Sequence, residues 1–71
     1  MGLFLQDELF MRRAIALAQQ AALLGEVPVG AVVVQNGEVI GEGYNQPISG
    51  CDPTAHAEII ALRDAARKIG N

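Results

Sequence analysis

The apolar residues of the first third of the chain recur at the three- and four-residue spacing of an amphipathic helix. Between Asp7 and Leu24 they form a broad face opposite polar positions that include Arg12, Arg13 and Gln19. The members of this face are Phe10, Met11, Ala14, Ile15, Leu17, Ala18, Ala21 and Ala22. Gly25 is well placed to end the helix in a left-handed conformation. The pattern therefore predicts a scaffold helix over residues 7–24.

The middle of the chain has the pattern of a β-hairpin. Residues 29–34 form a nearly continuous apolar run, which is typical of a strand buried on both faces. Asn36-Gly37 predicts a two-residue type I′ turn, and residues 39–43 return as a second strand. Gly41 and Gly43 in that strand indicate a bulge or close backbone packing. Because two strands alone do not form a stable sheet in water, we expect further strands from elsewhere.

The last third reads as a loop followed by a second helix. Residues 44–51 contain the breakers Pro47, Ser49 and Gly50. Asp52 can cap a helix and Pro53 fits its first position, so the helix is predicted from Pro53 to about Ile69, with Gly70 as its stop. Its apolar stripe is Ala55, Ile59, Leu62, Ala66 and Ile69. The order helix–strand–strand–helix predicts an α/β architecture with both helices packed on the sheet.

Two titratable residues stand at the start of this second helix. His56 and Glu58 fall in its first two turns, and the neighbours Ala61, Leu62 and Ala65 place Glu58 on or beside the face expected to be buried. An unpaired buried carboxylate costs several kcal/mol, so stability alone does not explain a glutamate there. Taken without context, His56 is more often an ordinary histidine at a helix end than a functional residue.

His56-Ala57-Glu58 is the H-x-E half of the zinc nucleobase-deaminase signature, in which P-C-x-x-C follows. Together with GEVPVGAVVV at residues 25–34, GEGYN at 41–45 and DPTAHAEIIALR at 52–63, nearly the whole chain resembles the tRNA adenosine deaminase family, within the cytidine/deoxycytidylate deaminase superfamily. DPTAHAE is also similar to guanine deaminases, and HAE alone to riboflavin-pathway and cytidylate deaminases. The EVPVGA segment favours the tRNA enzymes.

The resemblance implies a cytidine-deaminase-like three-layer α/β/α fold, of which residues 1–71 are the N-terminal helix–hairpin–helix half. It implies that His56 is a Zn²⁺ ligand and that Glu58 is the catalytic proton shuttle. The two cysteine ligands are expected from the P-C-x-x-C segment, which has no counterpart before the chain ends at Asn71. The isolated chain is therefore expected to be inactive. The implied reaction is the conversion of adenosine to inosine at the anticodon wobble position of tRNA.

The resemblance also implies a base-binding pocket. Its members are Val27, Pro28, Val29, Asn45 and the backbone of Ala57. From the residues alone, Asn45 is more often a turn former than a base contact, and sheet core explains the valines at least as well as a pocket does. Cys51 lies five residues before His56, which leaves open whether it binds metal or packs as a small apolar group.

Composition restricts the partners of the chain. The 71 residues carry a net charge of −3 with five basic residues, which argues against a self-sufficient nucleic-acid binder. Contacts to tRNA are therefore expected from the missing half or from the second subunit of a homodimer.

A single cysteine excludes an internal disulfide. No apolar run is long enough for a bilayer and no secretory signal is evident, so a cytoplasmic location is expected. The competing hypotheses are a guanine or other nucleobase deaminase and a non-catalytic, dimerising remnant.

Overall fold

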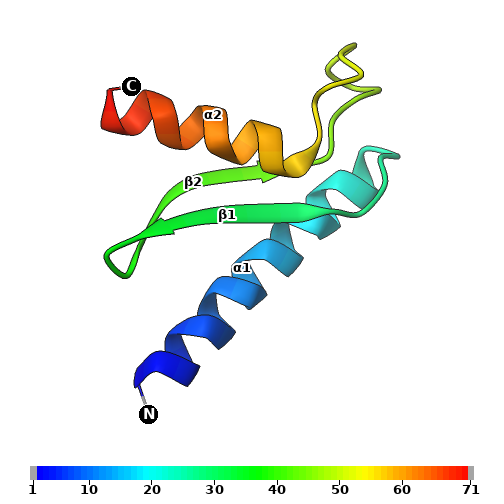
Figure 1. The fold of residues 1–71 in the computed structure, drawn as a ribbon. Coiled ribbons are helices and arrows are strands. Elements are labelled where there is room, and N and C mark those ends of the chain that lie inside the picture. Colours follow the sequence, from blue (N-terminus) through cyan, green and yellow to red (C-terminus); the bar gives the residue numbers. More distant parts are fainter. Residues whose placement is uncertain (1, 71) are drawn as a thin grey trace.

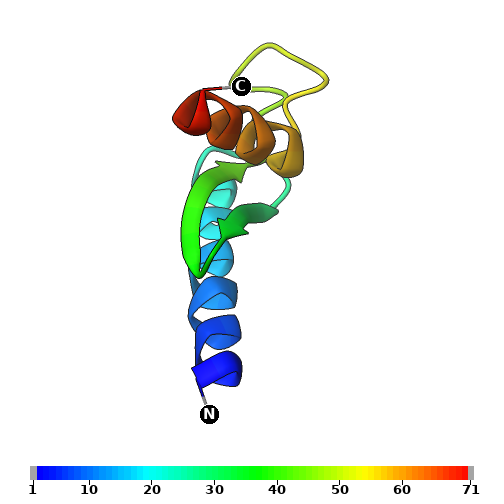
Figure 2. The same cartoon turned by 60° about the vertical axis from the view of Figure 1, so that its left-hand side comes forward.

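The computed structural model describes residues 2–70, with side chains from Asp7 onward. The chain forms helix α1 (Gly2–Leu23), strands β1 (Gly30–Gln35) and β2 (Glu38–Tyr44), and helix α2 (Ala57–Ile69). Figures 1 and 2 show the hairpin between the two helices, with α1 on one face and α2 on the other. The predicted α/β architecture is therefore confirmed. None of the helices within residues 2–70 is long and apolar enough to cross a membrane.

Helix α1 is longer than predicted at its N-terminal end. It begins at Gly2 instead of Asp7, because residues 3–6 contain no proline or other helix breaker that would stop it. The other end agrees with the prediction. Gly25 has a φ of 77°, and its N–H donates to the carbonyl of Ala22 at 3.0 Å. The left-handed glycine ends the helix and turns the chain towards β1.

The hairpin turn is confirmed, whereas the burial predicted for its first strand is wrong. Asn36 and Gly37 have φ values of 53° and 78°, as a type I′ turn requires. Val34 pairs with Val39 and Val33 with Gly41, so Ile40 is the extra residue of a bulge in β2. Among the described strands β1 pairs with β2 alone, so its other edge has no neighbour and Val34 remains 39% exposed.

Two glycines determine how closely α2 approaches the sheet. A Cβ atom built on Gly43 would lie 2.5 Å from the carbonyl oxygen of Ala57, and one built on Gly41 would lie 2.3 Å from that of Ala61. Gly30 has the same role towards α1, where a Cβ would meet the Ala14 carbonyl at 2.0 Å. The close backbone packing predicted for Gly41 and Gly43 is therefore confirmed.

The buried stripe of α2 differs from the predicted one. Ala57, Ala61 and Ala65, spaced by four residues, are 0%, 0% and 5% exposed. Leu62 and Ile69, which were predicted to be buried, are 56% and 48% exposed. The reason is steric, because a helix whose backbone touches strand glycines has room for methyl groups alone on the contacting face.

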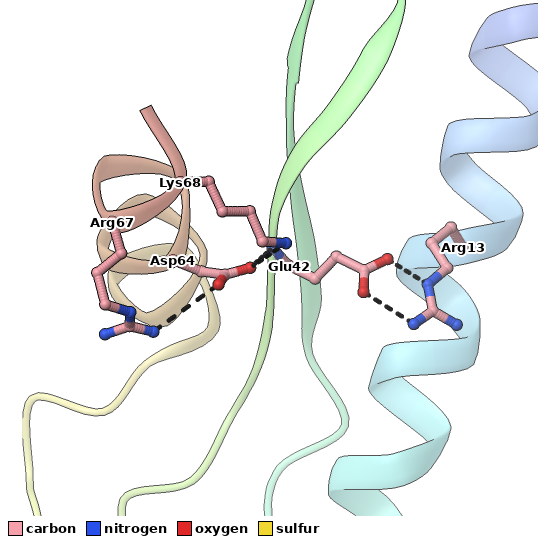
Figure 3. Close-up of polar contacts among 5 residues, drawn as sticks. All are labelled: Arg13, Glu42, Asp64, Arg67 and Lys68. Carbon is pink, nitrogen blue, oxygen red and sulfur yellow. Dashed lines mark hydrogen bonds and ion pairs between the residues drawn. The ribbon is translucent and has the colours of Figure 1, made fainter. Parts of the chain in front are cut away.

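A chain of charged groups connects α1, β2 and α2 (Figure 3). Glu42 of β2 accepts a bidentate hydrogen bond from Arg13 of α1, with 2.9 Å between Nη2 and Oε1. The backbone N–H of Glu42 donates to Asp64 of α2 at 3.0 Å, and Lys68 lies 3.1 Å from the same carboxylate. These contacts lower the pKa of both carboxyl groups: the hydrogen bond from Arg13 is the main cause at Glu42, and the Glu42 N–H is the main cause at Asp64.

Gly43→Ala should destabilise the fold by about 2 kcal/mol, because its methyl group would overlap backbone atoms of α2 that cannot move aside. Urea unfolding followed by circular dichroism measures the change. Glu38→Ala, at an exposed position in the same strand, is the control and should have little effect. A Gly43→Ala protein as stable as that control would contradict the close packing described here.

Candidate active site

The predicted site residues come from two connections that meet at one end of the hairpin. Gly30 pairs with Tyr44, so the residues before β1 lie beside those after β2. The N–H of Asn45 donates to the carbonyl of Val29 at 3.0 Å and extends this pairing by one step. Helix α2 begins at the same end (Figure 1). The structure therefore brings the 27–29 segment, Asn45 and the start of α2 together.

Asn45 caps helix α2 from a different element. Its side chain is 7% exposed, and Oδ1 accepts the N–H of Ala57 at 2.8 Å. His56 occupies the N-cap position with an extended backbone (φ −78°, ψ 153°), and its own side chain makes no capping hydrogen bond. Asn45 thus satisfies one of the backbone donors that a helix start leaves free. The alternative that Asn45 is only a turn former does not account for this bond.

The predicted cap at Asp52 is wrong. Oδ1 of Asp52 accepts from the backbone N–H of Thr54 at 2.9 Å and from its hydroxyl at 2.7 Å, which closes a local turn. These bonds lower the pKa of the Asp52 carboxyl, the Thr54 hydroxyl contributing most. The helix consequently begins at Ala57 instead of Pro53. Side-chain hydrogen bonding at Asp52 competes with helix formation and prevents residues 53–55 from becoming helical.

His56 has a fixed backbone and an exposed side chain. On one side of it, the carbonyl of Ala55 accepts the N–H of Gln46 at 2.9 Å; on the other, the N–H of Ala57 is bound by Asn45 at 2.8 Å. The N–H of His56 itself donates to Thr54 at 2.8 Å. The imidazole is therefore presented outward from a well-defined backbone position.

Glu58 is also exposed, which corrects the prediction that it lies on or beside the buried face. The contacting stripe runs through Ala57 and Ala61, and adjacent helix positions are rotated by about 100°. The Glu58 carboxylate consequently faces away from the sheet, in the first turn of α2.

The proposed pocket segment is exposed as well. Val27 and Val29 are 66% and 40% exposed, and Pro28 is also exposed. These residues precede β1, so the alternative that they form sheet core does not apply to the described part of the chain. Cys51 is exposed in a left-handed conformation with φ 51°, and so is not packed as a small apolar group either.

Glu26 is a buried polar residue that the sequence did not single out. Its side chain is 6% exposed and accepts two backbone N–H groups, from Ile48 at 3.2 Å and from Ser49 at 2.5 Å. Burial alone would raise the pKa of this carboxyl, but the hydrogen bonds from Ser49 and Ile48 outweigh it and hold the pKa below its usual value. Nothing in the order Gly25-Glu26-Val27 distinguishes an inward-pointing glutamate from a solvated one.

The donor set for a metal is incomplete within residues 2–70. No group of three or more His, Cys, Asp or Glu side chains in this range could hold a metal ion. His56 nevertheless suits a ligand role, because its imidazole is accessible and its backbone is held on both sides. The described residues thus offer one accessible imidazole on a fixed backbone.

Comparisons with known proteins match this chain to a family and to several relatives. The model of the cytidine and deoxycytidylate deaminase zinc-binding region matches residues 5–71. A tRNA-specific adenosine deaminase of Haemophilus influenzae is 58% identical over 66 residues, covering 92% of this chain and 38% of the relative. The chloroplastic tRNA(adenine(34)) deaminase of Arabidopsis thaliana is 48% identical over 63 residues, covering 89% of this chain and 5% of the relative. The chain thus spans well under half the length of these relatives.

Two solved structures are similar to the whole arrangement. One comes from a study of A-to-I editing by tRNA:A34 deaminases at the wobble position of transfer RNA; it superposes with a TM-score of 0.88 at 40% identity and covers 92% of this chain and 50% of that one. The other is guanine deaminase from Bacillus subtilis, with a TM-score of 0.81 at 44% identity, covering 89% of this chain and 41% of that one.

Asn45→Ala should lower the stability by about 1–2 kcal/mol, because the Ala57 N–H loses its acceptor. Asn45→Asp is the matched variant, since it keeps an acceptor oxygen at a helix N-terminus that favours negative charge, and it should stay near wild type. Urea unfolding, with hydrogen exchange at the Ala57 amide, measures both effects. Equal stability of all three proteins would show that Asn45 does not cap α2.

Zinc should bind the 71-residue chain weakly, because a single imidazole cannot replace a set containing two thiolates. Titration with a zinc indicator should show no stoichiometric binding at micromolar zinc, and His56→Ala should abolish the weak binding that remains. Stoichiometric binding that Cys51→Ser removes would contradict this expectation and would identify Cys51 as a ligand.

Proposed function

The chain belongs to the cytidine and deoxycytidylate deaminase family, and on this premise we propose that residues 1–71 form the N-terminal half of a single catalytic domain that converts adenosine to inosine in tRNA. The proposed substrate position is the wobble position of the anticodon. The observation that supports this most directly is geometric: the 27–29 segment, Asn45, His56 and Glu58 gather at one end of the hairpin.

His56 is the proposed metal ligand of this half. It would hold Zn²⁺ together with two cysteines from a P-C-x-x-C segment outside residues 1–71. When bound, zinc supplies a nucleophile from water at neutral pH. The contribution of this half is orientation, because the bonds to Ala55 and Ala57 fix the backbone from which the imidazole projects.

Glu58 is the proposed catalytic acid and base. Its carboxylate would take a proton from the attacking water and deliver protons to the ring nitrogen and the departing ammonia, so that adenosine and water give inosine and ammonia. Two positions inside one helix would point about 200° apart when separated by two residues. This constraint does not apply here, because His56 lies before the helix with an extended backbone.

The base pocket is proposed to form between two segments that the hairpin places side by side. Val27, Pro28 and Val29 offer exposed apolar surface for the faces of a base. Asn45 uses its oxygen to cap α2, and so the amide nitrogen is the donor proposed to read the base edge. The backbone of Ala57, whose N–H is bound by Asn45, is proposed to contact the ring of the base.

Guanine deamination is the second candidate function. The Bacillus subtilis guanine deaminase structure resembles this chain about as strongly as the tRNA-editing structure does. An apolar slot with one amide donor is compatible with either purine. Assays on an anticodon stem-loop and on free guanine distinguish the two substrates.

The partners of the complete protein are proposed to include tRNA and a second copy of the chain. All five basic side chains already lie near carboxylates, as the Arg12–Glu8 pair at 2.6 Å illustrates. Phosphate contacts are therefore proposed to come from the other half or from a second subunit. Exposed apolar side chains such as Leu23, at 86%, and Leu62 support a homodimer or a covering second half. A tRNA substrate also makes the cytoplasm the proposed location.

Activity of a completed domain tests this proposal. We define the completed domain as residues 1–71 followed by the C-terminal part of the Haemophilus influenzae relative. Glu58→Ala should leave the zinc content near one per domain and reduce inosine formation by several orders of magnitude, because both proton transfers are lost. His56→Ala should lose zinc and activity together.

Zinc analysis and inosine formation on an anticodon stem-loop measure these effects, with Glu38→Ala as the control. An active Glu58→Ala domain would rule out the proposed mechanism. Deamination of guanine but not of the stem-loop would favour the second candidate function.

A further inference from the structure

Glu26 connects the two segments from which the proposed site is built. It immediately precedes Val27, and its carboxylate binds the N–H groups of Ile48 and Ser49 in the loop that leads to His56. We propose that Glu26 is a positioning residue, which sets the location of the His56-bearing loop relative to the Val27–Val29 segment. This inference rests on the proposed function.

The carboxylate is suited to this task in a way that other side chains are not. Two N–H donors converge on it, and each of its oxygens accepts one of them. None of the ion pairs among residues 7–70 includes Glu26, so hydrogen bonds from Ile48 and Ser49, mainly from their backbone N–H groups, offset its burial. A glutamine would present one acceptor and one donor, and the donor would face an N–H group.

Glu26 is itself held firmly. Its N–H donates to the carbonyl of Ala21 at 2.9 Å, directly after the left-handed Gly25 that ends α1. Ala21 is 0% exposed and belongs to the buried face of α1. The side chain therefore projects from the rigid end of a helix, which is the support that a positioning residue requires.

The loop of residues 46–55 connects the groups bound by Glu26 to His56. Its base is closed by the N–H of Gln46 donating to Ala55 at 2.9 Å, and its far part by the N–H of Gly50 donating to Gln46 at 2.7 Å. Ile48 and Ser49 lie within this closed loop, so displacing them shifts Gln46 and Ala55, and with them His56. A shift of about 1 Å in a reacting group can cost a hundredfold in rate.

Glu26→Gln in the completed domain tests the proposal, with Glu38→Gln as a charge-matched control at an exposed position. Below the melting temperature of each protein, Glu26→Gln should keep one zinc per domain and reduce kcat by about ten- to a hundredfold. Glu26→Asp, which keeps both acceptors but is one methylene shorter, should be intermediate. Wild-type kcat in folded Glu26→Asp and Glu26→Gln would overturn the proposal, and Glu26→Asp alone decides if the glutamine variant does not fold.

Backbone NMR on the same proteins provides a readout that does not depend on activity. Relative to wild type, Glu26→Gln should move the amide resonances of Ile48 and Ser49 and also those of His56, whereas Glu38→Gln should leave all three unchanged. An unmoved His56 would overturn the positioning role. If the wild-type domain deaminated neither substrate, the proposed function would fail, and the NMR result would still decide the role of Glu26.

Discussion

The absence of side chains at Gly41 and Gly43 is the constraint on which the rest of this structure depends. With hydrogen atoms at these positions, the backbone of α2 rests directly on β2 through Ala57 and Ala61. That contact holds the start of the helix close to the end of β2. It places the first N–H of α2 within 2.8 Å of Asn45, one residue beyond the end of β2. A helix one methyl group further away would lose both its packing and its cap.

Two buried polar side chains fix the conformation of the loop between β2 and α2. Asn45 and Glu26 are 7% and 6% exposed, and both accept backbone N–H groups from residues distant in sequence. Burying such groups is costly unless their hydrogen bonds are satisfied. Because they are satisfied only when the 46–55 loop is in place, each of them favours one loop conformation over the alternatives. The position of His56 follows from that conformation.

Local signals predicted the elements, and long-range contacts decided the rest. The Asn36-Gly37 turn and the left-handed Gly25 depend on a few neighbouring residues, so the sequence identifies them. The start of α2 could not be predicted in this way. Asp52 is a good cap by local rules, but its carboxylate closes a turn with Thr54, and the helix begins where Asn45 reaches it from another element.

The same distinction applies to the site. The H-x-E spacing identifies His56 and Glu58 as candidates, because a motif is a property of neighbouring residues. The burial of a residue depends on contacts with distant parts of the chain. The alanine stripe of α2, which leaves Glu58 facing outward, packs on glycines in β2. Glu26 was missed for a related reason. Its partners, Ile48 and Ser49, are more than twenty residues away, and the two hydrogen bonds come from backbone N–H groups that almost any sequence would supply.

The division between buried and exposed groups explains how half of a site can be organised in advance. Everything that fixes the backbone, namely Asn45, Glu26 and the loop closure, is buried or internally bonded, whereas His56, Glu58 and Val27 point outward. The entropy of ordering these residues is consequently lost when this part folds, and it would not have to be lost again when the proposed substrate or metal binds. The proposed ligand His56 and the proposed proton carrier Glu58 would then need only partners of matching geometry, which is the condition under which positioned groups accelerate a reaction most.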